Sequence, residues 1–405
     1  MTAAIAADAY VWGYPLMAVH RTRAGHSGQV GGELVARDRL ATAADRSVVA
    51  PNNDTLYASG WYDLCAGDVT IEVEAMDRPD RYWSVMLLDA YTNVSYVCRR
   101  LHGSAGTSAR ITCDPDAGPD PGDGRTVIPI ATPTLWVLVR VLVAGPDDLD
   151  AARRALAGVR ARQVGSSRPA PSPATAPAEG ATAAADVGGA AWFRELRDAV
   201  AVDPPAPWHP APPPGLDRLL PDPPPPAVLA AAADRGEAHI VAHGRGVDRT
   251  AHGWGTRSRG AAFGDDVTYR AAFARYSLAG HLPAENRSYS RLVDGTRAAV
   301  LSFPPGGEPP VDGFWSLSLY GPDMFFVDNE IGRHSIGDRT PGLHRERDGS
   351  LAVTIGHERP AAPANWLPAP PGLCVLALRA YEGRPGVTGA TWFPPDLVPA
   401  GGPGG

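Results

Sequence analysis

The chain has no lysine: its 37 Lys and Arg residues, in a total of 405, are all arginine. A lysine Schiff base, a pyridoxal phosphate anchor and the lysine of a P-loop are therefore excluded. The four cysteines include no Cys-x-x-Cys pair, so the common zinc and redox motifs are absent. No apolar run reaches the length of a membrane helix, and no basic stripe with interleaved aromatics predicts nucleic acid as a partner.

The net charge, the N-terminal sequence and a histidine pair bear on the expected location and cofactors of the protein. The net charge of -7 is modest and is spread along the chain. The first residues lack a basic segment followed by an apolar core and a cleavage site, which predicts a cytoplasmic protein. His239 and His243 lie four residues apart on a predicted helix, a spacing that is more typical of a packed or solvated helix face than of a metal site. We expect neither a metal nor an organic cofactor.

One pattern occurs twice in the chain. Tyr82-Trp83-Ser84 begins an apolar strand near the start, and Phe314-Trp315-Ser316 begins another near the end. Each is followed, roughly fifty to sixty residues on, by a strand that carries a single arginine. The repetition predicts two similar β-domains. Alternation along each strand turns both tryptophans toward apolar neighbours, so we expect them in the core.

The predicted fold class is mainly β, with two antiparallel sandwich- or barrel-like domains joined by a helical and Pro-rich middle segment. The expected boundaries are an N-terminal helical segment (1–46), a first β-domain (47–164), a Pro/Ala-rich linker with helices (165–287) and a second β-domain (288–397). Two helices are predicted in the first half, one over 4–23 interrupted at Pro15 and one over 147–162. Residues 165–189 are expected to form a mobile linker.

Two arginines lie on apolar strand faces. Alternation puts Arg140 on one face with Trp136, Leu138 and Leu142, and it puts Arg379 on an equally apolar face. An unpaired buried charge costs several kcal/mol, so each needs a carboxylate or several carbonyls. Asp89, at the end of a neighbouring strand, is one candidate partner for Arg140. The alternatives are a structural ion pair inside a barrel, an arginine fork that binds an anionic substrate group, or an arginine that reaches solvent.

Polar side chains gather in two short segments. Residues 51–57 and 89–93 can satisfy their own backbones through Asx-turns, and they can also line a pocket mouth. If the segments converge, Asp54 and Asp89 could form a carboxylate pair for acid–base work. The residues predicted to bind a substrate around this pair are Asn53, Tyr57, Tyr91, Asn93 and Arg140.

These motifs, in this order, resemble a known pair of domains. The first half is similar to the domain of unknown function 1254 (DUF1254) in Pro-Asn-Asn-Asp-Thr-Leu-Tyr at 51–57, Asp-Arg-Tyr-Trp-Ser at 80–84 and Leu-Asp-Ala-Tyr-Thr-Asn at 88–93. The second half is similar to DUF1214 in Phe-Trp-Ser-Leu at 314–317, Asp-Gly-Ser-Leu at 348–351 and Asn-Trp-Leu-Pro-Ala-Pro at 365–370. The resemblance implies both domains in one chain, mostly β and linked by helices. It implies no settled reaction, so no catalytic residue is carried over.

Two functional hypotheses follow from the sequence. The first is an enzyme without an organic cofactor that acts on a small, partly apolar organic molecule by hydrolysis or acid–base isomerisation. The second is a non-catalytic ligand-binding or assembly protein that uses a barrel mouth or an exposed sheet edge. A small-molecule ligand is the expected partner in either case, with no membrane, and the sequence leaves a homo-oligomer open.

Overall fold

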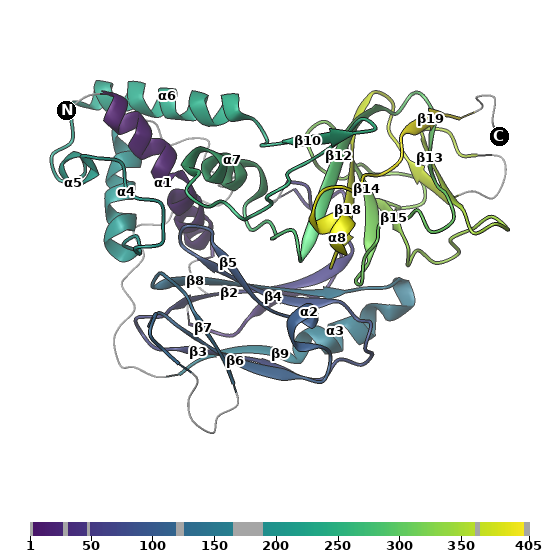
Figure 1. The fold of residues 1–405 in the computed structure, drawn as a ribbon, viewed down its shortest axis with the longest axis horizontal. Helices are drawn as coiled ribbons and strands as arrows, with labels where there is room; N and C mark the ends of the chain where they lie inside the picture. Colours follow the sequence, from purple (N-terminus) through teal and green to yellow (C-terminus); the bar gives the residue numbers. More distant parts are fainter. Residues whose placement is uncertain are drawn as a thin grey trace.

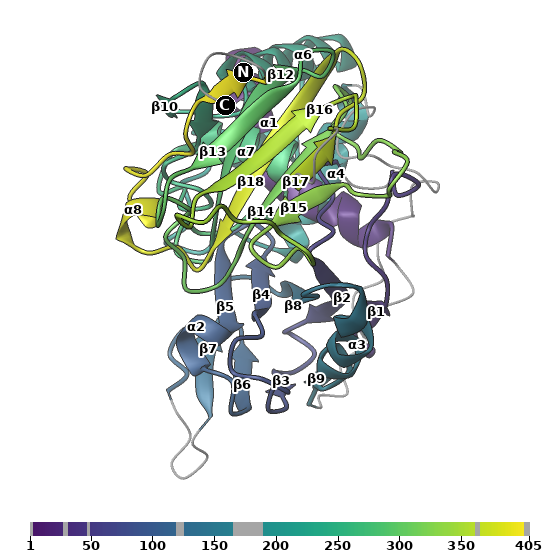
Figure 2. The same ribbon diagram turned by 90° about the vertical axis from the view of Figure 1, so that its right-hand side faces the viewer.

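A computed structural model describes residues 3–26, 31–46, 49–118, 125–164, 189–360 and 365–400. The chain is mainly β and has three parts. Figure 1 shows the first β-domain below, a group of helices at the upper left and the second β-domain at the upper right. The view in Figure 2 confirms that the second β-domain stands over the first.

The helical part is built around α1 (Ala3–Ala24). Helices α4 (Ala190–Val202), α5 (Leu216–Leu219), α6 (Pro226–His243) and α7 (Val267–Ser277) pack against it in one apolar cluster. The predicted interruption at Pro15 is wrong, because α1 continues through it. Proline within a helix costs about 3 kcal/mol. Burial of α1 on nearly every side outweighs this cost.

The first β-domain is a sandwich of two sheets. Its front sheet, which faces the second β-domain, has the order β1-β2-β8-β4-β5, and its back sheet has the order β7-β6-β3-β9. The front strands are β1 (Val35–Arg37), β2 (Thr55–Asp63), β8 (Thr134–Leu142), β4 (Trp83–Asp89) and β5 (Val94–Cys98). The back strands are β7 (Thr126–Pro129), β6 (Thr107–Thr112), β3 (Val69–Val73) and β9 (Val159–Gln163). Short helical segments α2 (Arg99–His102), η1 (Pro146–Asp148) and α3 (Leu149–Ala157) complete it.

The second β-domain has the same two layers. Its front sheet has the order β10-β11-β12-β18-β14-β15, and its back sheet has the order β17-β16-β13-β19. The front strands are β10 (Arg249–Ala251), β11 (Trp254–Thr256), β12 (Asn286–Asp294), β18 (Leu373–Tyr381), β14 (Trp315–Tyr320) and β15 (Ser335–Gly337). The back strands are β17 (Asn365–Pro368), β16 (Leu351–Gly356), β13 (Ala299–Phe303) and β19 (Leu397–Pro399), and a short helix α8 (Pro385–Thr388) follows β18.

The two β-domains are one fold repeated. Every strand from β1 to β9 has its counterpart ten numbers higher, in the same place in the sheet order. The pairing also repeats: β6 and β7 are parallel, as are β16 and β17, whereas the other strand pairs in both domains are antiparallel. The register repeats as well, since Ser84 pairs with Arg140 and Ser316 pairs with Arg379. The doubled Trp-Ser pattern therefore marks equivalent strands, β4 and β14.

Two sequence expectations need correction. The helix predicted over 147–162 ends at Ala157, and β9 follows because Val159 and Ala161 are buried in alternation and pair with β3. Strands β10 and β11 lie within the segment predicted to hold only linker and helices, and they extend the second front sheet. The predicted linker over 165–189 lies, except for its last residue, outside the described residues.

The front sheets divide their residues between two faces. The inner face of each front sheet packs on its own back sheet, and Trp83 and Trp315, which are 1% and 2% exposed, lie there as expected. The outer faces turn toward each other. We call the contact zone between the outer faces of β2-β8-β4 and β12-β18-β14, with the loop that follows α7, the seam.

Candidate functional site

Arg140 projects from β8 into the seam. It stands between Tyr57 on β2 and Ser84 on β4 and is 6% exposed. Its guanidinium donates to Ala279 O (3.3 Å), and Nη1 lies 3.7 Å from Met86 Sδ. The guanidinium carbon is 5.5 Å from the centre of the Tyr57 ring, a cation–π contact.

Arg379 holds the equivalent position on β18 and is 9% exposed. It donates to Ser318 Oγ and to Ala50 O, both at 3.0 Å, and it lies 5.6 Å from the Tyr320 ring centre. Each arginine therefore donates to a carbonyl in the segment that leads into the other domain.

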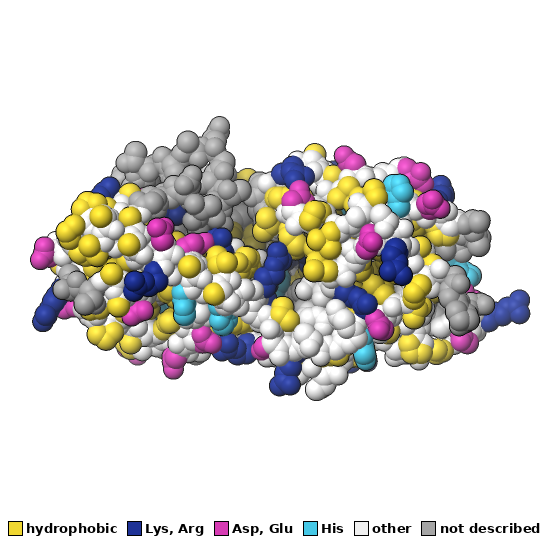
Figure 3. Space-filling model, turned by 90° about the horizontal axis from the view of Figure 1, so that it is seen from above, with side chains coloured by type: hydrophobic (Ala, Val, Ile, Leu, Met, Phe, Trp, Pro, Cys, Tyr) yellow, Lys and Arg dark blue, Asp and Glu magenta, His cyan; other side chains and the backbone are white. Residues whose placement is uncertain are grey.

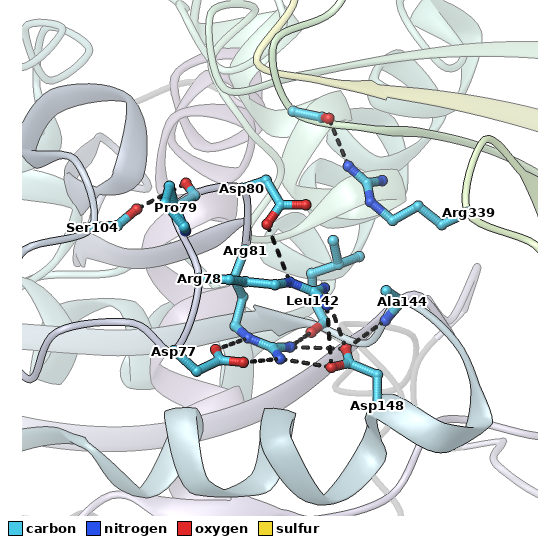
Figure 4. A network of polar contacts seen from close by, with 11 residues as sticks. Asp77, Arg78, Pro79, Asp80, Arg81, Ser104, Leu142, Ala144, Asp148 and Arg339 are labelled. Atoms are coloured by element: carbon cyan, nitrogen blue, oxygen red, sulfur yellow. Dashed lines mark hydrogen bonds and ion pairs between the residues drawn. The ribbon is translucent and has the colours of Figure 1, made fainter.

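Neither arginine has a described carboxylate within the 4.0 Å of an ion pair. Figure 4 shows Arg81, a buried arginine with a full set of partners, for comparison. Arg81 is fully buried, and its five N–H groups are shared among Asp77, Asp148 and Leu142 O. Arg140 has one carbonyl and one thioether instead. The structural ion pair considered for Arg140 does not form among the described residues.

The carbonyls that receive these arginines come from unusual backbone. Ala50 has φ 52° and Ala279 has φ 59°, both in the left-handed region that alanine seldom adopts. Such strain costs on the order of 1–3 kcal/mol and concentrates at functional sites. The local fold thus holds both carbonyls against arginines at an energetic cost.

Asp54 lies just before β2 and faces the second domain. Its Oδ2 accepts a hydrogen bond from Ser316 Oγ at 2.6 Å, and its backbone N–H donates to Asn52 Oδ1 in the expected Asx-turn. Burial raises the pKa of the Asp54 carboxyl, although the Ser316 hydrogen bond and the charge of Arg379 oppose this. Beside it, Asn53 Oδ1 is buried without a hydrogen-bond partner. Asn52 Nδ2 donates to the hydroxyl of Tyr381 (2.8 Å).

His281 is a seam residue that the sequence did not single out. It lies in the loop after α7, and its Nδ1 is 3.2 Å from the hydroxyl of Tyr96. Burial, together with the positive charges of Arg140 and Arg379, lowers the pKa of His281 well below its ordinary value. The imidazole is therefore neutral at pH 7. No feature of the sequence marks His281 as functional, because its place depends on the docking of the two β-domains.

The other predicted site residues lie elsewhere. Asp89 ends β4 opposite Leu135, whereas Asp54 lies beyond the opposite end of β8, so the two carboxylates do not meet. Both Asp89 oxygens are occupied, by Asn93 Nδ2, His209 Nε2 and two backbone N–H groups. The Nδ1 of His209 accepts from Ala206 N, so this imidazole has no free nitrogen to act as a base.

Tyr91 and Asn93 belong to the same buried group as Asp89. The hydroxyl of Tyr91 donates to Asp203 O (3.0 Å), and Asn93 Oδ1 accepts from Arg270 (2.8 Å). These contacts fix the end of β4 to the Pro-rich segment and to α7. Of the predicted set, the seam brings together Asn53, Asp54, Tyr57 and Arg140 only.

Parts of the seam keep some contact with solvent. Asp54, Tyr57 and His281 are only partly buried. On the face seen from above in Figure 3, arginine and acidic side chains are interspersed. Two shallow pockets, of about 330 and 420 Å³, lie on the helical part and do not include seam residues.

Metal and membrane features can be stated for the described residues alone. Their His, Cys, Asp and Glu side chains form no group of three suited to a metal ion. His239 Nε2 is instead 3.1 Å from Thr268 Oγ1. Among the described helices, none is both long and apolar enough to cross a membrane.

Comparisons with known proteins agree with the two-domain architecture. A family model described as "Protein of unknown function (DUF1254)" matches residues 32–163, and one described as "Protein of unknown function (DUF1214)" matches residues 282–385. No curated protein matches the chain. The crystal structure of the VPA0106 protein from Vibrio parahaemolyticus is similar, with 19% identity, a TM-score of 0.70, and coverage of 99% of this chain and 100% of that one. An uncharacterized protein from Burkholderia cenocepacia gives 12% identity, a TM-score of 0.46, and coverage of 92% and 84%.

Proposed function

The chain belongs to the proteins that carry a DUF1254 and a DUF1214 domain in one polypeptide, and we propose that the two domains together bind a small organic anion in the seam. The observation that carries this proposal is Arg140. Its guanidinium is buried and has no described carboxylate within ion-pair distance. One carbonyl and one weak sulfur acceptor are the only hydrogen-bond acceptors found for it among the described residues. Arg379 repeats the arrangement with two neutral acceptors.

The physical argument is one of charge balance. A buried charge without a partner costs several kcal/mol, and folded proteins keep such a charge where a ligand completes the site. Arginine forks match carboxylate and phosphate geometry. An anion bound between Arg140 and Arg379 would supply the acceptors that the chain itself does not.

The ligand also has an apolar part in this proposal. Tyr82, Phe314 and Tyr381 pack together where the two domains meet, with the Phe314 and Tyr381 ring centres 4.2 Å apart. Tyr57 lies over Arg140 on the other side. Aromatic rings beside a cation favour an organic carboxylate over an inorganic anion.

Binding of carboxylates and phosphate esters to the purified protein tests the proposal. We expect an organic carboxylate to raise the unfolding temperature of the wild-type chain, since a ligand held only by the folded state stabilises it. Arg140→Met should abolish this shift. The control is Arg160→Met, which removes a half-exposed arginine paired with Glu74 on the back sheet and should leave the shift unchanged. A shift that persists in Arg140→Met would refute the seam as the binding site.

A second candidate function is acid–base catalysis on the bound anion, with Asp54 as the proton-transferring group. It is favoured by the partial burial of Asp54, which raises the pKa of its carboxyl above the ordinary value. Asp89 has no part in this version, because its oxygens are already occupied.

The variant Asp54→Asn separates binding from catalysis. We expect it to bind the anion as tightly as the wild type or more tightly, because it removes a competing negative charge near Arg379. Any turnover found with a bound carboxylate should fall by about 10²-fold or more. Unchanged turnover in Asp54→Asn would eliminate Asp54 as the catalytic group and leave binding alone.

A further inference from the structure

The seam is built from equivalent residues of the two β-domains. Asp54 and Glu285 each come immediately before the first long front strand, β2 or β12. Arg140 and Arg379 each stand two residues before the end of the central strand. Ser84 and Ser316 are each the second residue of the strand beside it.

The contacts between these residues are reciprocal. Asp54 of the first domain accepts from Ser316 of the second (2.6 Å). Glu285 of the second accepts from the hydroxyl of Tyr82 of the first (2.8 Å), and that hydroxyl is 3.0 Å from Ser84 Oγ.

The arginines that follow β5 and β15 also interact with the acidic residue of the other domain. Arg100, two residues after β5, donates to Glu285 of the other domain (3.3 Å). Arg339, two residues after β15, acts through its charge on Asp54 of the other domain. Figure 4 shows Arg339 at the edge of the seam above Arg81. Such reciprocity is the mark of a two-fold interface between identical subunits. Here a single chain supplies both sides.

Arg140 and Arg379 are therefore two copies of one binding element that face the same space. Arg140 donates to Ala279 O, two residues before His281, and the His281 ring centre lies 6.1 Å from that of Tyr381. Tyr381 is two residues from Arg379 on β18 and so shares its strand face. Both positive charges also lower the pKa of His281. Asp54 does not neutralise Arg379 by direct pairing, because its hydrogen bond goes to Ser316. Each guanidinium therefore keeps N–H groups that no described carboxylate fills.

We propose that the ligand is an organic dicarboxylate, with one carboxylate bound by Arg140 and the other by Arg379 across an apolar middle. This inference rests on the proposed binding function and specifies its ligand class. His281 precedes Glu285 by four residues, as Ala50 precedes Asp54, so only the second domain would offer the ligand a neutral imidazole.

Matched acids test the inference. Adipate and hexanoate have equal carbon chains and differ in the second carboxylate, so titration calorimetry on the full-length chain compares one fork with two. We expect adipate to bind about tenfold more tightly or better, since a charge-assisted hydrogen bond is worth about 1.5–3 kcal/mol. Succinate, glutarate and pimelate cover shorter and longer spans between the two forks.

Single variants locate the second carboxylate. In Arg140→Gln and in Arg379→Gln, the diacid should fall to the affinity of the monoacid, whereas Arg160→Gln on the back sheet should keep the wild-type ratio. Arg140→Lys keeps the charge without the fork and should retain part of the preference, which guards against a variant that fails to fold. If the wild type bound diacids and monoacids equally and Arg140→Gln lost this binding, the dicarboxylate proposal would be wrong. The proposed binding of an anion in the seam would stand. Absence of binding by every carboxylate and phosphate tested would overturn both.

Discussion

Asp338 lies beside Arg339 at the edge of the seam. It should make the free energy of unfolding fall as the pH rises, whereas most carboxylates have the opposite effect. Burial raises its pKa to about 6, although its ion pair with Arg339 (3.1 Å) opposes the shift. The unfolded chain releases this proton near pH 3.9. Stability contributed by the protonated form is therefore complete below about pH 4 and is lost as the pH rises through about 6.

The variant Asp338→Asn tests this linkage. At 1.36 kcal/mol per pKa unit, the free energy of unfolding of Asp338→Asn relative to wild type should increase by up to about 3 kcal/mol between pH 4 and pH 8. Urea unfolding at the two pH values measures it. Asp312→Asn, at an exposed ion pair with Arg384, should change the difference by less than about 0.5 kcal/mol. A relative stability that stays constant or falls with pH would contradict the assignment.

At the same scale, sequence could identify some seam residues but not their partners. Alternation correctly predicted that Arg140 shares an apolar face, since Trp136 and Leu138 pack together on it. The cluster at 51–57 drew attention to Asp54, which contacts Ser316 and whose role in a site stays a prediction. The expected convergence of Asp54 with Asp89 failed. Strands β2 and β4 run in the same direction, Asp54 precedes β2 and Asp89 ends β4, so the two carboxylates lie at opposite ends of the strands. Glu285 was missed, because aligning the two halves on Trp83 and Trp315 puts Asn286, the next residue, opposite Asp54.

At the scale of elements, the errors have one cause: tertiary pairing outweighed local preference. The segment 159–163 follows directly on α3 and continues its charged pattern, so it was predicted as helix, yet it forms β9 because β3 offers an edge that must be covered. Helix α1 contains a proline that predicted a break, and burial by its neighbours holds it in one piece.

The strands themselves were more predictable. Strands β4, β8, β14 and β18 were predicted and found, because each is a short, mainly apolar run that is buried in the structure. The short strands β10 and β11 have too few residues for a pattern. They form by pairing alongside β12, which only the folded domain provides.

At the scale of the whole molecule, the proposed anion site would need both β-domains. In this proposal each β-sandwich supplies one arginine from its outer face, and the two sandwiches dock face to face around the ligand. The repeated Trp-Ser pattern predicted two similar domains. It could not predict that they face each other, since docking depends on contacts such as Asn52 to Tyr381 between residues far apart in the chain.

The unfolding free energy of Arg140→Met without added ligand, compared with that of Arg81→Met, tests the central claim most directly. Both substitutions remove a buried arginine, but Arg81 is saturated by two carboxylates and a carbonyl, whereas Arg140 contacts one carbonyl and one thioether. We predict that Arg81→Met loses about 3–5 kcal/mol, because it strands buried carboxylates, while Arg140→Met is unchanged or gains about 1–3 kcal/mol. A loss in Arg140→Met as large as that in Arg81→Met would mean that Arg140 serves the fold, and the proposed anion site would be contradicted.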